Sequence, residues 1–402
     1  MNYKKPTAQD LRRVNSAEIL RKIYFDGPIS RLEVSQQIGI SPATVTNIVF
    51  DLLEKNLLVE SGSKRSDGGR PSTLLTINPA YGHFIGCEVG ESFINVELFD
   101  IRFTSCQKVS FSLNEERVEP EQVVEKISQG IQEVLSAAGI KENKVIGMGV
   151  GFPGLVDPVR GISVFTPNWG WHDVSLLKAI KRKHPFPMFL ENGAKAMAMG
   201  EALFGAGKGV NNLTVLLVGT GVGCGIISDR SLFRGSMNNA GEIGHTIMEL
   251  DGPVCRCGGH GCTEVYLGAN GIIDRYRSLN ADSDHPNRYD QIAYIQYILQ
   301  KSSEGQPAAI QVVNETLRYL GVTLANLVNL LNPQLLLLGG WSGLLFGSRY
   351  LDKIKEQTAY YALAQSLAHT SIRLCELADD SVSKGAASLV LEHFFESGGE
   401  LK

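Results

Sequence analysis

Residues 238–264 read NNAGEIGHTIMELDGPVCRCGGHGCTE and hold three of the chain's seven cysteines. The candidate metal ligands in this segment are His245, Cys255, Cys257 and Cys262. Three thiolates and one imidazole are the ligand set of a closed structural zinc site, because zinc binds four N or S ligands tetrahedrally. The intervening glycines allow a short loop to curl around a small ion. We therefore expect a structural Zn²⁺; the alternatives are a disulfide with a spare thiol, or three buried cysteines.

Two carboxylates flank these ligands, at Glu242 and Glu264. Neither is needed to complete a site that already has three sulfurs and one nitrogen. Both are therefore free to accept hydrogen bonds from a polar molecule that the loop helps to position.

The length and composition are those of a globular protein with two or three domains. The chain has 402 residues, of which 43% are hydrophobic and 20% charged. No apolar stretch approaches the ~20 residues of a membrane span, and the N-terminus lacks the apolar core of a secretion signal. Cysteines with metal-like spacing and no secretion signal are typical of the reducing cytoplasm. We expect a cytoplasmic protein without a membrane partner.

Charge is spread unevenly along the chain. The first 78 residues hold eleven Lys and Arg against eight Asp and Glu, or +3, whereas the remainder holds 27 against 34, or −7. A basic N-terminal part on an acidic body favours an anionic partner for that part alone. A merely solvated surface is the alternative.

The N-terminal part has the signals of three helices. Apolar spacing predicts a first helix that ends near residues 26–28, and Ser30 with Glu33 forms a capping box for a second that stops at Gly39. Ser41 and Pro42 then start a third helix. In a helix-turn-helix, residues near the start of the last helix face DNA. Here the candidates are Ser41, Ala43, Thr44, Thr46 and Asn47.

Two short alternating segments follow, LLVESG and STLLTIN, around the loop SKRSDGGRP. This pattern predicts a β-wing, with Lys64, Arg65 and Arg70 as its basic residues. An arginine in an extended segment suits a narrow A·T minor groove. We predict that residues 1–80 form a winged helix-turn-helix domain that binds operator DNA; a three-helix packing module without DNA is the alternative.

Residues 81–402 repeat strand–glycine turn–strand units between helices, which predicts an α/β body with two lobes. Glycine turns hold phosphates through backbone N–H groups, although many only reverse the chain. Trp169 and Trp171 are candidates to stack on a sugar ring, although one of them is equally well explained as core.

The order of motifs resembles the ROK family (repressor, open reading frame, kinase), and the resemblance covers essentially the whole chain. The matching motifs are GRP in the wing, GFPGLVD at 151–157, PNWGW at 167–171, ENGAKAMAMGE at 191–201, GTGVGCG at 219–225, GEIGH at 241–245, CRCGGHGCTE at 255–264 and LNPQLLLLGG at 331–340. The resemblance implies an actin-like, sugar-kinase (ribonuclease H-like) body with two lobes and a structural zinc loop behind the winged helix.

The resemblance also implies roles for single residues. It assigns zinc to His245, Cys255, Cys257 and Cys262, and it places the sugar against Gly154, Asn168, Asn192, Glu242, His245 and Glu264. It divides the body into a first lobe at 81–190, on which the C-terminal helix 382–396 packs back, and a second lobe at 191–381 with the zinc loop and dimerisation helices.

Two motifs depart from the pattern of the family's kinases. These place a catalytic Asp directly after the Asn that opens a helix, where this chain has Gly193 after Asn192. Their first phosphate loop resembles Asp-x-Gly-Gly-Thr, where this chain reads EVGES at 88–92, and Glu91 would repel a triphosphate. We predict that phosphoryl transfer is lost and that the chain has no catalytic residue. The alternative is that Glu191 serves as the base and Ser92 serves the phosphate.

These observations predict a sugar-responsive DNA-binding transcriptional regulator, a repressor of carbohydrate uptake or catabolism genes. It would bind a palindromic operator as a homodimer or a dimer of dimers. Because Gly193 removes a carboxylate near the sugar 6-position, the effector is either a sugar or a sugar phosphate. Two alternatives remain: an active ATP-dependent sugar kinase with a fused DNA-binding head, and a repressor gated by a sugar-transport protein.

Overall fold

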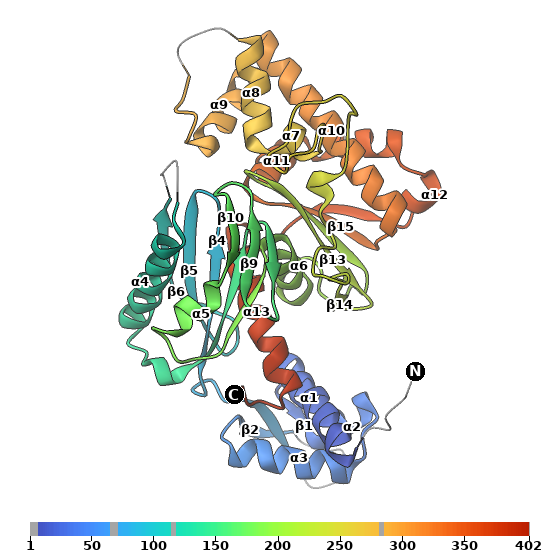
Figure 1. Cartoon of the computed structure of the whole chain (residues 1–402). Helices are drawn as coiled ribbons and strands as arrows, with labels where there is room; N and C mark the ends of the chain where they lie inside the picture. Colours follow the sequence, from blue (N-terminus) through green and yellow to red (C-terminus); the bar gives the residue numbers. More distant parts are fainter. Residues whose placement is uncertain (1–6, 65–70, 114–117, 281–284, 402) are drawn as a thin grey trace.

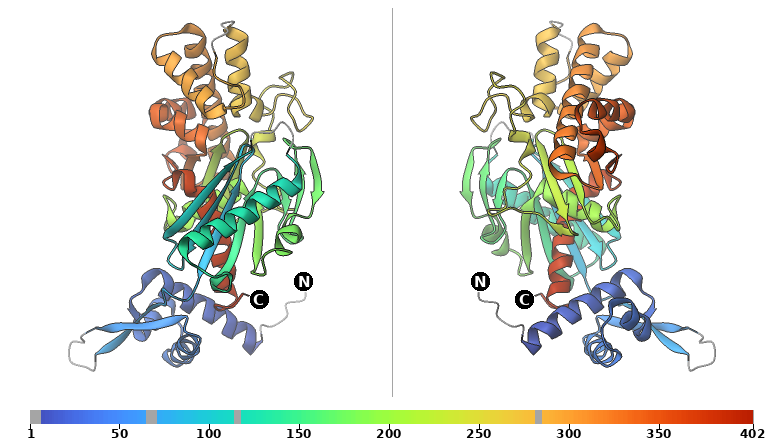
Figure 2. Two further views of the ribbon diagram at one scale, coloured as in Figure 1. Left: turned by 90° about the vertical axis from the view of Figure 1, so that its left-hand side faces the viewer. Right: turned by 90° about the vertical axis from the view of Figure 1, so that its right-hand side faces the viewer.

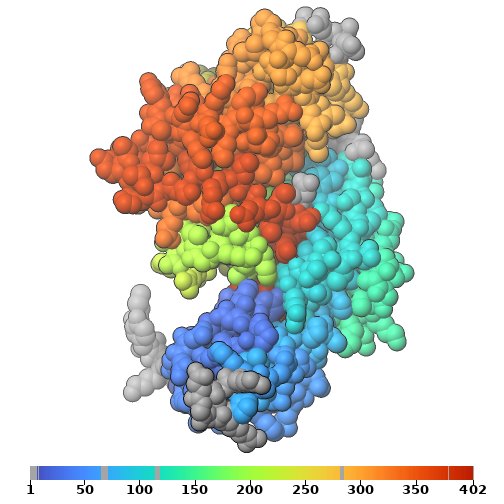
Figure 3. Space-filling view, turned by 180° about the vertical axis from the view of Figure 1, so that it is seen from behind, coloured from blue at the N-terminus to red at the C-terminus, as the bar shows by residue number. Residues whose placement is uncertain are grey.

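The computed structural model describes residues 7–64, 71–113, 118–280 and 285–401, and these form three parts. An N-terminal unit, residues 7–78, lies below two lobes, and Figure 1 shows it in blue at the bottom of the molecule. Seen from behind, the same stacking places the second lobe at the top, with the first lobe beside and below it (Figure 3).

The N-terminal unit contains three helices and a small sheet with strand order β1-β3-β2. Its elements are α1 (Ala8–Asp26), β1 (Ile29–Ser30), α2 (Arg31–Ile38), α3 (Pro42–Glu54), β2 (Leu58–Lys64) and β3 (Ser72–Ile77). The predicted capping box of Ser30 with Glu33 is confirmed, as is the stop of α2 at Gly39, whose φ of 72° is left-handed. The short strand β1, which the sequence did not indicate, pairs with β3. In Figure 2 the β2–β3 hairpin extends away from the body.

The first lobe is built on a five-stranded sheet with order β11-β7-β4-β5-β6. Its strands are β4 (His83–Val89), β5 (Phe93–Asp100), β6 (Ser105–Ser112), β7 (Val145–Phe152) and β11 (Met188–Asn192). A second, three-stranded sheet and two helices accompany it: β8 (Leu155–Asp157), β9 (Ile162–Thr166), β10 (Trp171–Val174), α4 (Pro120–Ala138) and α5 (Leu176–Lys181).

The second lobe is built on a five-stranded sheet with order β14-β13-β12-β15-β16. Its strands are β12 (Leu213–Val218), β13 (Val222–Ser228), β14 (Ser231–Leu232), β15 (Leu335–Gly339) and β16 (Ser371–Leu374). Its helices are α6 (Gly193–Phe204), α7 (Glu264–Leu267), α8 (Ala269–Leu279), α9 (Gln291–Ser303), α10 (Pro307–Leu331), α11 (Trp341–Tyr361) and α12 (Ala364–Leu367).

The two large sheets share one topology. In each, the first three strands pair antiparallel as a meander, and the fourth and fifth add in parallel beside the first. The predicted α/β body with two lobes is therefore confirmed. In open α/β sheets, ligands bind outside the carboxyl ends of parallel strands, so the turns that follow β4, β7, β11, β12 and β15 matter for a site.

The last helix, α13 (Ser381–Glu396), joins all three parts of the molecule. It lies so close to β7 and α6 that neither crossing has room for a side chain. A Cβ on Gly149 would lie 1.8 Å from the Ala386 carbonyl oxygen, and a Cβ on Gly385 would lie 1.8 Å from that of Ala196. Glycine is required at both crossings.

The far end of α13 belongs to the core of the N-terminal unit. Phe394 and Phe395 are buried in one cluster with Ile19, Leu20 and Ile23 of α1. Two further contacts attach α1 to this end of α13. The Arg21 guanidinium donates to Glu392 at 2.9 Å, and it lies 5.0 Å from the centre of the Phe395 ring. The N-terminal unit is therefore packed onto the body and not merely tethered to it.

Phe395→Ala should detach this connection. Removing a fully buried phenylalanine lowers the free energy of unfolding by about 3–5 kcal/mol, and Phe395 is 0% exposed. Unfolding in guanidinium chloride measures the change in the free energy of unfolding. The matched control is Phe50→Ala on α3, where the side chain is 58% exposed. Equal losses for the two variants would contradict the packing described.

Among the helices of the described residues, none combines the length and the apolar character needed to cross a bilayer.

Candidate functional site

A cavity of about 510 Å³ lies between the two lobes. Its walls include the β4–β5 turn of the first lobe and the β12–β13 turn of the second. The structure brings all six residues of the predicted sugar site to this cavity: Gly154, Asn168, Asn192, Glu242, His245 and Glu264.

Two of these residues fix the loops around the cavity. Gly154 has a φ of 75°, and a Cβ there would lie 2.3 Å from the Phe165 carbonyl oxygen, so only glycine fits. The Asn192 side chain caps α6 by accepting from the Ala194 N–H at 3.0 Å, and it donates to the Gly154 carbonyl at 3.0 Å. Asn192 therefore ties the Gly154 loop to the start of α6.

Glu242 presents a carboxylate to the cavity that the protein leaves open. Within the described parts of the chain, no hydrogen-bond donor reaches it. Burial raises the pKa of Glu242, and the nearby Lys195 ammonium acts against that rise. Lys195 is itself buried, which lowers its pKa, and it donates to the Asn238 carbonyl at 2.8 Å. Carboxylates accept from paired hydroxyls, so Glu242 is available to a polyhydroxylated ligand.

Glu264, the second predicted carboxylate, is already engaged. Its two oxygens accept from the Arg256 guanidinium at 2.8 and 3.1 Å, and one also accepts from the Val222 N–H at 3.1 Å. A third nitrogen of Arg256 donates to Glu91 at 2.7 Å. Sequence reasoning missed Arg256 and treated Glu91 as an unpaired repelling charge. The structure corrects that picture, because Arg256 neutralises Glu91.

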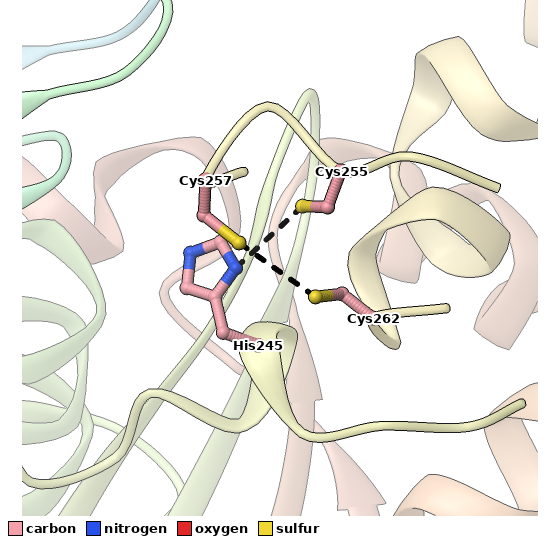
Figure 4. A group of neighbouring side chains, drawn as sticks. All are labelled: His245, Cys255, Cys257 and Cys262. Atoms are coloured by element: carbon pink, nitrogen blue, oxygen red, sulfur yellow. Dashed lines mark hydrogen bonds between the residues drawn. The ribbon is translucent and has the colours of Figure 1, made fainter. Parts of the chain in front are cut away.

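The candidate metal ligands converge as predicted. The side-chain N and S atoms of His245, Cys255, Cys257 and Cys262 all lie within 4.8 Å of one another, and Figure 4 shows the four side chains pointing together. The disulfide alternative is wrong for the described residues, because all three cysteines are free.

The spacing of the donor atoms fits zinc. Cys257 Sγ lies 3.7 Å from Cys262 Sγ, and Cys255 Sγ lies 3.7 Å from His245 Nδ1. Zn–S bonds of ~2.3 Å at tetrahedral angles place two sulfurs ~3.8 Å apart. A ring that binds metal through Nδ1 keeps Nε2 for another partner. His245, which also lines the cavity, can therefore serve the metal and a ligand together.

The tryptophans at 169 and 171 do not line the cavity. Trp171 is buried and donates to the Val118 carbonyl at 2.9 Å, while Trp169 packs against it. Trp171 is therefore a core residue, which was the alternative interpretation for one of the two tryptophans, and the structure does not support either ring as a sugar-stacking residue of this cavity. Trp341, at the start of α11, lines the cavity instead. Its position after the Gly339-Gly340 turn was the available signal, because such turns border the cleft.

The predicted DNA-contacting residues of α3 lie at its N-terminal end. Ala43, Thr46 and Asn47 are exposed, whereas Ser41 and Thr44 bond to each other within the cap at 2.9 Å. The Thr46 hydroxyl donates back to the Pro42 carbonyl.

In the predicted wing, Lys64 of β2 is exposed and pairs with Glu33 at 2.7 Å. Arg65 and Arg70 lie outside the described residues.

A model of the ROK family matches residues 84–393, which is most of the chain. The protein belongs to the ROK family. The xylose repressor of Caldicellulosiruptor bescii is 30% identical to it over 396 residues, covering 95% of this chain and 96% of its own length.

Two solved ROK structures share the fold. A ROK family transcriptional regulator, described as a homolog of the Escherichia coli MLC protein, superposes with a TM-score of 0.81 at 24% identity, over 97% of this chain and 98% of its own. A ROK family glucokinase from Streptomyces griseus, in complex with glucose and AMPPNP, gives a TM-score of 0.64 at 26% identity, over 77% and 99%. The match to the regulator includes the N-terminal part, and the match to the glucokinase covers 77% of this chain.

Packing does not require glycine at Gly193, the position where the resemblance to the family's kinases predicts an Asp. A Cβ on Gly193 would have its nearest neighbours at 3.9 Å. Glu191, two residues earlier, is 1% exposed and does not line the cavity. Its carboxylate pairs with Arg234 at 2.9 Å and accepts from Asn238 at 2.9 Å.

Proposed function

We propose that the protein is a sugar-responsive, DNA-binding transcriptional repressor of carbohydrate uptake or catabolism genes. The observation that carries this proposal is α13, which lines the cavity through Val382 and lies in the core of the N-terminal unit through Phe394 and Phe395. A change in the cavity therefore has a direct packed route to the unit that we assign to DNA. The family and the named repressor relative support the same conclusion.

The effector we propose is a sugar or a sugar phosphate in the cavity between the lobes. Glu242 would accept from its hydroxyls, with Gly154, Asn168, Asn192, His245 and Glu264 around it. The absence of a side chain at Gly193 removes the repulsion that a carboxylate would exert on a 6-phosphate. Calorimetric titration with matched pairs, such as D-glucose and glucose 6-phosphate, distinguishes the two classes, and D-xylose belongs in the series because of the xylose repressor relative. A preference for unphosphorylated sugars would exclude the phosphate version.

We propose further that residues 1–80 are a winged helix-turn-helix domain, in which α3 enters the major groove. The body would divide into lobes at 81–190 and 191–381, with the helix 382–396 returning to the first. A ligand shifts a conformational equilibrium only if its affinities for the two states differ. The test is a band shift on promoter DNA beside sugar catabolic genes, with and without sugars. Binding that ignores sequence, or that no sugar releases, would refute the proposal.

Asn47→Ala tests the DNA-reading helix. Loss of one good base contact costs about 1–3 kcal/mol, so operator affinity should fall roughly 5- to 150-fold. Fluorescence anisotropy measures it, with the exposed Asn326→Ala on α10 as a control of the same residue type. Arg70→Ala is expected to weaken binding in the same assay. Unchanged affinity in both would remove α3 and the wing from the interface.

We propose that the body has no kinase activity, because the position of the catalytic Asp holds Gly193 and Glu191 is held by Arg234 and Asn238. The alternative is an active ATP-dependent sugar kinase, and the glucokinase neighbour favours testing it. Release of ADP with a hexose would decide for the kinase. A Cβ at Gly193 would have its nearest neighbours at 3.9 Å, so the Gly193→Asp side chain can be accommodated there. This variant therefore tests whether a carboxylate at position 193 restores the catalytic base.

We propose that the protein acts as a homodimer or a dimer of dimers on a palindromic operator, since two heads match two half-sites. Exposed apolar side chains on the second lobe support this, among them Leu330 at 76% and Tyr360 at 80% exposed. Sedimentation with and without operator DNA measures the assembly. Control by a sugar-transport protein is the remaining alternative, which a pull-down from sugar-grown cells addresses.

A further inference from the structure

The ionic contact of Arg256 crosses the cleft. Glu91 belongs to the β4–β5 turn of the first lobe, whereas Arg256 and Glu264 belong to the zinc loop and α7 of the second. One guanidinium thus joins two carboxylates from different lobes, with N–O distances of 2.7 and 2.8 Å. Arg256 is suited to this, because its planar fork binds a carboxylate at two points and leaves a further N–H for another acceptor.

The contact is largely shielded from water. The side chains of Glu91 and Glu264 are 11% and 9% exposed, and that of Arg256 is 27% exposed. Charges in such surroundings attract each other more strongly than on an open surface. Removing one partner of a shielded, hydrogen-bonded pair leaves the other charge uncompensated. The bridge is therefore a strong candidate for a contact that holds the lobes together.

The side chains of this bridge also occupy the space next to the β12–β13 turn, which contains Gly221. A Cβ on Gly221 would lie 2.6 Å from an Arg256 nitrogen and 2.7 Å from a Glu264 oxygen. The sequence marks this turn and the β4–β5 turn as places where backbone N–H groups would hold phosphates. Here the protein's own guanidinium and carboxylates lie between them.

We propose that Arg256 is an internal latch that holds the two lobes together across the cleft, and that an effector opens it by competing for Glu264. The competition follows from the contacts, because both Glu264 oxygens already accept from Arg256 whereas Glu242 accepts from nothing in the described structure. A ligand can bind Glu242 without disturbing the protein. To gain Glu264 as well, it displaces Arg256 and weakens the link to Glu91. This last step rests on the proposed function; the latch itself does not.

The test removes Glu91, which lines the cavity but is neither a predicted metal ligand nor a predicted sugar-binding residue, whereas Arg256 lies between the ligands Cys255 and Cys257. Glu91→Ala leaves Arg256 and Glu264 in place but cuts the link between the lobes. Hydrogen–deuterium exchange of the ligand-free full chain then measures the exchange rates of the peptides that cover the β4–β5 and β12–β13 turns. Loss of an interlobe contact should raise their exchange rates roughly tenfold or more. Glu91→Gln, which keeps the shape of the side chain, should show a smaller rise in the same peptides.

The matched control is Glu125→Ala, which breaks an ion pair with Lys183 inside the first lobe. Its exchange at the two turns should equal that of the unaltered protein. If the Glu91 variants match this control at both turns, the latch is refuted, whether or not any sugar binds.

A second arm tests the coupling to the effector, with D-xylose and D-glucose as probes. Glu91→Ala should lower the sugar concentration that half-releases operator DNA by roughly 3- to 10-fold, because the competing contact is weakened. If Glu91→Ala shows faster exchange at the two turns but releases operator DNA at the same sugar concentration as Glu125→Ala, the coupling is refuted and the latch is retained. Absence of release in the unaltered protein contradicts the proposed function instead, while the exchange result still decides the latch.

Discussion

Cys257→Ser is expected to release the metal and to loosen the loop that carries Arg256 and Glu264. A serine hydroxyl does not replace a thiolate as a zinc ligand, and a structural site with three ligands binds the ion far more weakly than a closed site with four. The bound ion would hold the loop's ligands in one tetrahedral arrangement. Metal analysis of the purified variant should therefore fall from about one zinc per chain to near zero.

Loss of the metal should also lower the stability of the folded protein. Metal that binds only the folded state stabilises it by mass action, so the variant should melt at a lower temperature and no longer respond to a chelator. Cys106→Ser, at an exposed cysteine outside the cluster, is the matched control. A Cys257 variant that keeps stoichiometric zinc and an unchanged melting temperature would disprove the assignment of this ligand.

Glu242→Ala is expected to abolish induction while leaving operator binding intact. Its carboxylate faces the cavity without a hydrogen bond from the described protein, so its removal costs the folded state little and the ligand much. Hydrogen bonds to a charged group contribute about 1.5–3 kcal/mol, so effector affinity should fall roughly 10- to 150-fold. In cells this variant is a repressor that sugar no longer releases.

The control for this substitution is Glu376→Ala, an exposed glutamate of the second lobe that does not line the cavity. It should keep both operator binding and induction. Normal sugar release by the Glu242 variant would show that the effector lies elsewhere, and loss of operator binding would mean that Glu242 supports the fold instead.

Local signals carried much of the prediction. The capping box of Ser30 and Glu33 and the left-handed stop at Gly39 depend only on neighbours along the chain, and both lie where the sequence placed them. The metal ligands could also be predicted from the sequence, because Cys255, Cys257 and Cys262 belong to one short loop and their chemistry limits the choice of ion.

What the sequence did not disclose depends on distant pairing. Glu91 and Arg256 are 165 positions apart, so no spacing rule links them, and an acidic residue in a glycine turn looks like an unpaired charge. The sequence suggested Trp169 and Trp171 at the cavity, whereas the structure has Trp341 there, for a similar reason. Which aromatic ring faces a cleft is decided by how two lobes close, and residue type does not encode that.

Because α13 contacts the cavity at one end and the N-terminal unit at the other, a small tilt of this helix would displace its far end. Sixteen residues at ~1.5 Å each make a rod of roughly 24 Å, so a tilt of about 5° at the cavity end displaces the other end by about 2 Å. In a dimer both heads would move, and successive major-groove half-sites lie only ~34 Å apart on one face of DNA. A shift too small to alter either lobe's core could therefore be large enough to put two recognition helices out of phase with their operator.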